Sequence, residues 1–122
     1  MANVLIIDDN RDAADMLAAL LTMRGHVVTQ AYSGPEGLAA IAAVPPAVVV
    51  SDLNMPGMDG YEVAERVRRN KLIAQPYLIA YSGWNHAGAQ AKSSHHGFDA
   101  HLSKTAPIAS LLAAINAAGM PE

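Results

Sequence analysis

Two hydrophobic periods alternate along this chain, and their alternation restricts the fold more than any other feature. Five short apolar runs have the length and the aliphatic composition of strands. They occupy residues 3–7, 26–32, 47–51, 77–82 and 99–103. The segments between them repeat apolar residues at the i, i+3, i+4 spacing of a helix. Because parallel strands need right-handed helical crossovers, the pattern predicts a doubly wound α/β domain with a parallel sheet.

Helix-capping residues stand where this pattern needs them. Asn10 precedes the first helical segment and Gly25 follows it, while Ser33 or Gly34 precedes the second, which would begin at Pro35. Asn and Ser side chains accept hydrogen bonds from the first helical turn, and Gly allows a helix to end. We predict the third helix at about residues 59–70 and the fourth at about 88–96. The residues of the first helix that we expect to face the sheet are Met16, Leu17, Leu20 and Leu21.

The composition limits both the class of protein and its partners. With 122 residues, the chain has the size of one domain with its own core. Hydrophobic residues make up 52% and charged residues 16%, which is a globular balance. The formal net charge of -3 gives no field that would attract nucleic acid or an anionic membrane surface. We therefore expect a single domain over residues 1–122 that binds neither nucleic acid nor membrane.

The chain also lacks cysteine and long apolar segments. The absence of cysteine removes disulfides and thiolate metal sites, and it favours a reducing, cytoplasmic compartment. The longest apolar stretch, LAAIAAVPPAVVV, is interrupted by Pro45 and Pro46. It is shorter than the roughly 20 residues that cross a bilayer, so we expect no membrane-spanning segment.

A basic cluster and a histidine pair have ordinary explanations. The cluster consists of Arg66, Arg68, Arg69 and Lys71. Because it lies at the end of the third predicted helix in an acidic chain, we interpret it as a solvated helix end. His95 and His96 are adjacent and therefore point to different sides of a helix, which argues against a shared metal.

Residues that could carry chemistry follow four of the five predicted strands. Asp8 and Asp9 follow the first strand, Asp52 follows the third, Ser82 ends the fourth and Lys104 follows the fifth. In doubly wound sheets the ligand site lies beyond the carboxyl ends of the strands. Each residue alone is an ordinary loop residue, but together they predict one site.

The residue types at this edge indicate their chemistry. Three carboxylates in one crevice repel one another, and a bound cation relieves that repulsion. Mg²⁺ suits them because it prefers a few carboxylate or carbonyl oxygens and keeps other positions for water or phosphate oxygens. Ser82 and Lys104 add a hydroxyl and an ammonium that can hold a phosphoryl group. The residues therefore predict a site for Mg²⁺ and a phosphoryl group.

With these motifs the chain resembles the receiver domains of two-component response regulators over almost its whole length. The resemblance is carried, in order, by IIDDN, VVVSDLNMPGMDGYE, LIAYSG and FDAHLSK. It implies a flavodoxin-like, five-stranded parallel sheet of order 2-1-3-4-5 with five helices. It also implies a phosphorylation-dependent signalling switch, not an enzyme, whose partner is a histidine kinase or a histidine phosphotransfer protein.

The resemblance also implies a role for each residue of the site. Asp52 would accept the phosphoryl group from a phosphohistidine, and Lys104 would compensate charge on the acyl phosphate. Ser82 would move toward a phosphoryl oxygen and shift the face formed by the fourth helix, fifth strand and fifth helix. The ligands of Mg²⁺ would be Asp8, Asp9, Asp52 and the backbone carbonyl of Asn54. The shifted face would serve an output protein or a homodimer, and the motif FDAHLSK also fits a receiver from a hybrid kinase.

Two residues depart from the family's pattern. Thr105 replaces the proline that commonly follows the lysine. A cis bond before a non-proline residue costs roughly 3 to 4 kcal/mol, so we predict a trans bond between Lys104 and Thr105. His101 replaces an aromatic residue, and it is either a partly buried structural residue or a substitute switch element.

Two alternative functions stay open. The chain could be a degenerate receiver that acts as a phosphorylation-independent interaction module, for which Thr105 and His101 are the support. It could also be an aspartate-nucleophile phosphatase of the haloacid dehalogenase type. That family, however, keeps its nucleophile in a DxD motif after its first strand, where this chain has Asp8, Asp9 and Asn10.

Overall fold

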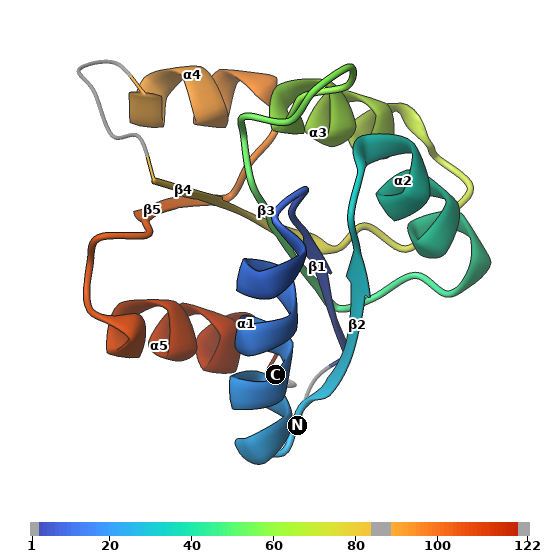
Figure 1. Ribbon diagram of the computed structural model, residues 1–122. Coiled ribbons are helices and arrows are strands. Elements are labelled where there is room, and N and C mark those ends of the chain that lie inside the picture. The colour runs from blue at the N-terminus through green and yellow to red at the C-terminus, as the bar shows by residue number, and fades with distance from the viewer. Residues whose placement is uncertain (1–2, 84–88, 120–122) are drawn as a thin grey trace.

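The chain folds into a five-stranded parallel sheet with helices on both faces (Figure 1). The computed structural model describes residues 3–83 and 89–119. The strands are β1 (Asn3–Ile7), β2 (Val27–Ala31), β3 (Val48–Ser51), β4 (Tyr77–Ser82) and β5 (Ala100–Ser103). The helices are α1 (Arg11–Met23), α2 (Gly34–Ala43), α3 (Gly60–Arg69), α4 (Ala89–His96) and α5 (Ile108–Gly119). The strand order β2-β1-β3-β4-β5 confirms the predicted fold.

Alternate residues of the central strands pack into two separate cores. Val4 and Ile6 of β1 lie in a core with residues of α1 and α5. Leu5 and Ile7 lie in the opposite core with residues of α2 and α3. The valines of β3, residues 48–50, are at most 1% exposed. Burial on both faces explains why this strand shows no polar alternation in the sequence.

Side-chain caps set the starts of three helices as their residue types predict. Asn10 Oδ1 accepts a hydrogen bond from the N–H of Ala13 at 3.1 Å, and Ser33 Oγ accepts one from Glu36 at 3.2 Å. Asp59 caps α3 in the same way. These caps satisfy N–H groups that have no partner inside the helix. The predicted start of the fourth helix, residue 88, lies outside the described residues.

The prediction that Met16 faces the sheet is wrong. Met16 is 75% exposed, whereas Leu17 and Leu21 are buried as predicted. Alanines 14 and 18 complete the buried stripe of α1. Met16 lies about 100° around the helix from Leu17, which places it beside this stripe. Small buried alanines, not large apolar residues alone, thus define the inner face of α1.

The interpretation of the basic cluster as a solvated helix end is wrong for Arg68. Its guanidinium donates to the carbonyl oxygens of Gly97 (2.9 Å) and Pro76 (3.0 Å), to the Gln75 side chain (3.0 Å) and to Asp99 Oδ2 (2.7 Å). Two other arginines pair only with glutamates of the same helix. Arg68 therefore ties the end of α3 to the start of β4 and to the segment between α4 and β5.

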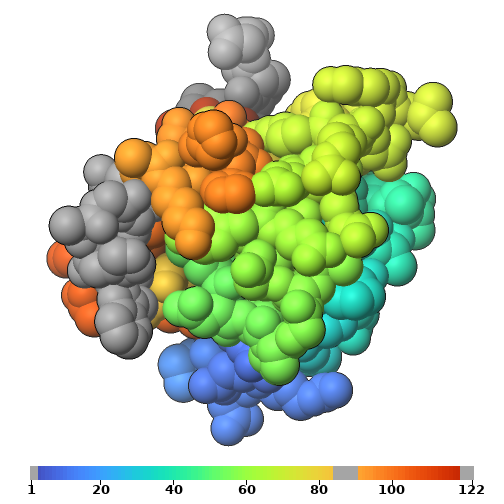
Figure 2. Space-filling model, turned by 90° about the horizontal axis from the view of Figure 1, so that it is seen from above, coloured from blue at the N-terminus to red at the C-terminus, as the bar shows by residue number. Residues whose placement is uncertain are grey.

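Helices α3 and α4 lie side by side, and Figure 2 shows them on one face of the molecule. His96 of α4 donates to the Glu65 carboxylate of α3, and this hydrogen bond lowers the pKa of Glu65 below its ordinary value. The centroids of the His96 and Tyr61 rings lie 5.0 Å apart. The Lys92 Nζ lies over the Tyr61 ring, 4.5 Å from its centroid. His96 is thus a helix-packing residue.

Among the described helices, none is long and apolar enough to cross a membrane.

Candidate functional site

The carboxyl ends of β1 and β3 bring three acids together. Asp8 and Asp9 follow β1, Asp52 follows β3, and one carboxylate oxygen from each lies within 4.8 Å of the others. The sheet hydrogen bonds continue past the strands, since Asp8 N donates to Ala31 O at 3.1 Å and Asp52 N donates to Ile7 O at 2.8 Å. The backbone of two of the acids is therefore fixed by the sheet itself.

Lys104, which follows β5, reaches into this acidic cluster. Its Nζ lies 2.7 Å from Asp8 Oδ2 and 3.7 Å from Asp52 Oδ2. Its backbone N–H donates to the carbonyl of Ser82 at 2.8 Å. Burial alone would lower the pKa of Lys104, but the hydrogen bond to Asp8 and the nearby carboxylate charges together raise it. Lys104 is consequently a firmly charged ammonium beside Asp52.

The Asp52 carboxylate sits in a partly desolvated position. Burial raises its pKa above the ordinary value; the Lys104 charge opposes this, and the Asp8 charge adds to it. Backbone N–H groups of Leu53 and Asn54 also face the carboxylate. The Leu53 N–H donates to Asp52 Oδ1 at 2.8 Å, so this oxygen already has a partner. The second oxygen, Oδ2, faces Lys104.

The structure brings together four of the predicted site residues: Asp8, Asp9, Asp52 and Lys104. Ser82 ends β4, the strand between β3 and β5, and is 1% exposed. Asn54 is exposed in the loop between β3 and α3. The role of the Asn54 carbonyl as a metal ligand stays a prediction. The movement of Ser82 toward a phosphoryl oxygen also stays a prediction.

Two hydroxyl groups shape the turn that carries Lys104, and sequence reasoning missed them. Ser103 Oγ lies 2.7 Å from Thr105 Oγ1 and accepts a hydrogen bond from the Thr105 N–H at 3.1 Å. All described peptide bonds are trans, which confirms the prediction for the bond between Lys104 and Thr105. A Ser-x-Thr spacing directly after a strand is the signal that could have found this turn.

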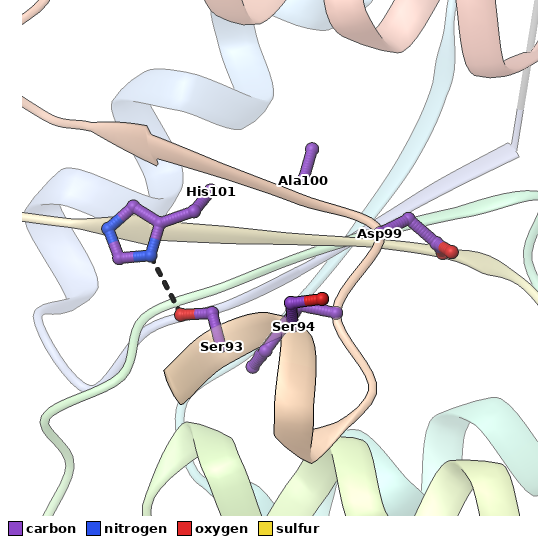
Figure 3. Close-up of a pocket in the computed structure, with 6 residues that line it drawn as sticks. Ser93, Ser94, Asp99, Ala100 and His101 are labelled. Atoms are coloured by element: carbon purple, nitrogen blue, oxygen red, sulfur yellow. Dashed lines mark hydrogen bonds between the residues drawn. The ribbon is translucent and has the colours of Figure 1, made fainter. Parts of the chain in front are cut away.

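His101 lies in a small pocket between α4 and β5 (Figure 3). Its Nδ1 shares a hydrogen bond of 2.7 Å with Ser93 Oγ of α4, and Ser93 is 1% exposed. His101 is half-buried, as the structural interpretation predicted. The bond joins α4 to β5, and a role of His101 as a switch element stays a prediction.

An apolar groove begins at the acidic cluster, which sequence reasoning also missed. Asp8 and Lys104 form its polar end, and its apolar lining comes mainly from α1, with one residue each from β4 and α5. The apolar lining residues are Ala13, Met16, Leu17, Leu20, Tyr81 and Ile108. Exposed Met16 is therefore part of a surface feature next to the acids.

The donor set fits a hard divalent cation. The three acids offer only oxygen ligands, their oxygens are close enough to share one ion, and Asp8 is 5% exposed. Oxygen-only sites of this kind suit Mg²⁺ better than softer metals.

Comparisons with known proteins agree with this geometry. The family described as response regulator receiver domain matches residues 4–116. The DNA-binding dual master transcriptional regulator RpaA of Synechocystis is 29% identical over 117 residues, which are 96% of this chain and 48% of RpaA. This chain thus spans about half the length of that relative.

Two solved structures have closely similar folds. The chemotaxis protein CheY4 of Vibrio cholerae has a TM-score of 0.88 at 26% identity, with coverage of 97% of this chain and 98% of that chain. The response regulator TrrA of Thermotoga maritima, solved in complex with Mg(2+)-BeF, has a TM-score of 0.85 at 24% identity, with coverage of 97% and 99%.

Proposed function

Because the chain belongs to the response regulator receiver domain family, we propose that it is the phosphorylation-dependent switch of a two-component phosphorelay, with Asp52 as the phosphoacceptor. A receiver domain is typically a phosphoacceptor and not a classical enzyme. The observation that carries the proposal is the convergence of three carboxylates with Lys104, whose Nζ lies 3.7 Å from Asp52 Oδ2. The departure at Thr105 leaves that lysine beside the carboxylates.

The chemistry follows from the two oxygens of Asp52. Oδ1 holds the Leu53 N–H, which leaves Oδ2 to attack phosphorus. As the new O–P bond forms, the N–P bond of the donor phosphohistidine breaks and its electron pair returns to the imidazole. Such transfers need in-line positioning and stabilisation of the equatorial oxygens more than a strong nucleophile. Lys104 is close enough to contact one of those oxygens.

Mg²⁺ is the proposed cofactor. Asp8, Asp9 and Asp52 would hold it, with the backbone carbonyl of Asn54 as a further ligand. When bound, the ion neutralises charge that builds up on the phosphoryl oxygens. The similar fold of TrrA, which was solved with Mg(2+)-BeF, supports this choice.

Ser82 and the α4–β5–α5 face are the proposed output of the switch. A phosphoryl group adds close to two negative charges and several acceptor oxygens, which can reorder a nearby segment. The Ser82 carbonyl already accepts the Lys104 N–H, so the two residues are linked through the backbone. Typical coupling energies of about 1 to 3 kcal/mol would shift populations toward the active form.

The apolar groove is the proposed docking surface for the phosphodonor. A donor histidine must approach Asp52 closely, and the groove begins at Asp8 and Lys104. A histidine kinase or a histidine phosphotransfer protein that laid an apolar helix face over Met16 and Ile108 would meet this requirement.

Intact-mass analysis tests the proposed function directly. The protein is incubated with Mg²⁺ and a small acyl phosphate, and we expect it to gain one phosphoryl group. Asp52→Asn should gain none, and chelation of Mg²⁺ should abolish the gain in the wild type. No gain in the wild type, or an equal gain in Asp52→Asn, would reject the proposal. Transfer from a panel of phosphorylated kinases would then identify the donor.

A further inference from the structure

Gly60, the first residue of α3, lies directly against the backbone of Asp52. A Cβ atom on Gly60 would overlap the Asp52 carbonyl oxygen and stand 2.9 Å from the Leu53 Cα. The Gly60 N–H donates to the Leu53 carbonyl at 3.0 Å. The first turn of α3 therefore rests on the Asp52–Leu53 peptide, and it can do so because Gly60 has no side chain.

The Asp52 backbone has little freedom to move away from such an atom. Its N–H is held by Ile7 O at 2.8 Å, within the sheet. On the other side, the Leu53 N–H is held by Asp52 Oδ1 at 2.8 Å. Any shift of the peptide therefore also moves the carboxylate that the proposed chemistry uses.

Gly34 offers an instructive contrast. It is the first residue of α2, as Gly60 is of α3, and a Cβ there would also meet close neighbours. Those neighbours are side-chain atoms of Met58, with Cγ and Sδ at 2.8 Å. The third neighbour is the Met58 Cβ at 2.9 Å. A change of rotamer can move Cγ and Sδ away, so that only Cβ must yield, whereas the three neighbours at Gly60 are all backbone atoms.

We infer that Gly60 is a positioning residue for Asp52: its bare backbone lets α3 hold the Asp52–Leu53 peptide where the carboxylate meets Lys104 and the other two acids. The inference rests on the proposed function, because it assigns Gly60 to the same site. Mg²⁺ demands near-ideal octahedral geometry, so a displaced carboxylate weakens its binding. A misplacement of about 1 Å can slow a reaction about 100-fold.

The test compares Gly60→Ala with its matched control, Gly34→Ala. Both variants place alanine at the first position of a helix and add one methyl group against close neighbours. We expect Gly60→Ala to raise the Kd for Mg²⁺ about tenfold and to slow phosphorylation by a small acyl phosphate by at least as much. We expect Gly34→Ala to stay within about twofold of the wild type in both.

The NMR chemical shift of the Leu53 amide proton separates the two roles. It would not change if Gly60 only stabilised the fold. It reports the hydrogen bond to Asp52 Oδ1 and is measured without Mg²⁺, well below the melting temperature of each variant. We expect a shift in Gly60→Ala and none in Gly34→Ala. A folded Gly60→Ala with a wild-type resonance and a Kd within about twofold would overturn the inference, as would equal effects in both variants.

If Gly60→Ala does not fold, Asp59→Ala replaces it. This change removes the cap on the Glu62 N–H and frays the same turn without adding an atom. We expect a smaller rise in the Kd for Mg²⁺ and a smaller shift of the Leu53 resonance, and unchanged values would overturn the inference. Neither readout needs phosphotransfer. A wild type that is never phosphorylated would therefore reject the proposed function without deciding the role of Gly60.

Discussion

At the scale of single residues, the contact between Lys104 and Asp8 dominates the site. The Asp8 side chain is 7% exposed, and the Lys104 ammonium is bonded to one of its oxygens at 2.7 Å. The other Asp8 oxygen accepts the Asn10 N–H at 3.0 Å. A buried carboxylate without its charge partner is costly, so this contact also contributes to the stability of the folded protein.

Lys104→Met should lower the free energy of unfolding by about 1 to 2 kcal/mol in the absence of Mg²⁺, because Asp8 loses its partner. Saturating Mg²⁺ should restore much of the loss, since the cation takes over the role of the ammonium. Urea denaturation with chelator and with Mg²⁺ measures both effects. A loss that Mg²⁺ leaves unchanged would contradict the expectation.

The raised pKa of Asp52 makes a second prediction at this scale. Because burial raises this pKa, the folded protein holds the proton more strongly than the unfolded chain does. Ionised Asp52 therefore destabilises the fold at pH values above its raised pKa, and the penalty disappears as the pH falls below its ordinary value of about 4. Asp52→Asn should be more stable than the wild type at pH 7 without Mg²⁺, and the difference should shrink toward zero as the pH falls below about 4. Equal stability at pH 7 would contradict this account.

At the scale of secondary-structure elements, Arg68 links more of the fold than any other arginine that the structure describes. It holds the end of α3, the residues before β4 and the turn before β5 together. Asp99 Oδ2 also accepts the Leu78 N–H at 2.8 Å, so the network reaches into β4 itself. These elements meet at the amino ends of β4 and β5, opposite the acidic cluster.

Arg68→Ala should lower the free energy of unfolding by about 2 to 3 kcal/mol, because two carbonyls lose the Arg68 donor and the Asp99 carboxylate loses its charge partner. Arg69→Ala is the matched control, since its side chain is 73% exposed and pairs only with Glu65 of its own helix. We expect that control to cost less than about 0.5 kcal/mol. Chemical denaturation measures the free energy of unfolding of both variants. Similar losses in the two would show that the Arg68 network does not stabilise the fold.

At the scale of the whole molecule, the apolar groove is the proposed docking surface for the phosphodonor, and this proposal makes a prediction. Met16→Glu should slow phosphotransfer from a protein donor about tenfold, because it places a charge where an apolar helix face is proposed to dock. Phosphorylation by a small acyl phosphate should stay within about twofold. Met23→Glu is the control, because Met23 is also exposed on α1 but does not line the groove. If Met16→Glu reacted more slowly with both donors, the substitution would have damaged the phosphorylation site and not the docking surface.

The global architecture could be predicted from the sequence because each element carries its own signal. The apolar runs gave all five strands to within one residue at each end, and the strand ends gave the acids and Lys104. Met16 and Arg68 were misread for a different reason. Periodicity describes one segment at a time, whereas the partners of Arg68 include Gly97 and Asp99, which lie far along the chain. Such partners appear only when the elements are packed.

The sheet ladder that continues from β2 through β1 to Asp52 has a consequence for folding. Two of the acids owe their places to neighbouring strands, since Asp8 bonds to Ala31 and Asp52 bonds to Ile7. A slip of one residue in either pairing would send a carboxylate to the opposite face of the sheet. If the proposed site holds Mg²⁺, only a chain with these three strands in register would bind the ion, and a misfolded copy would not be phosphorylated.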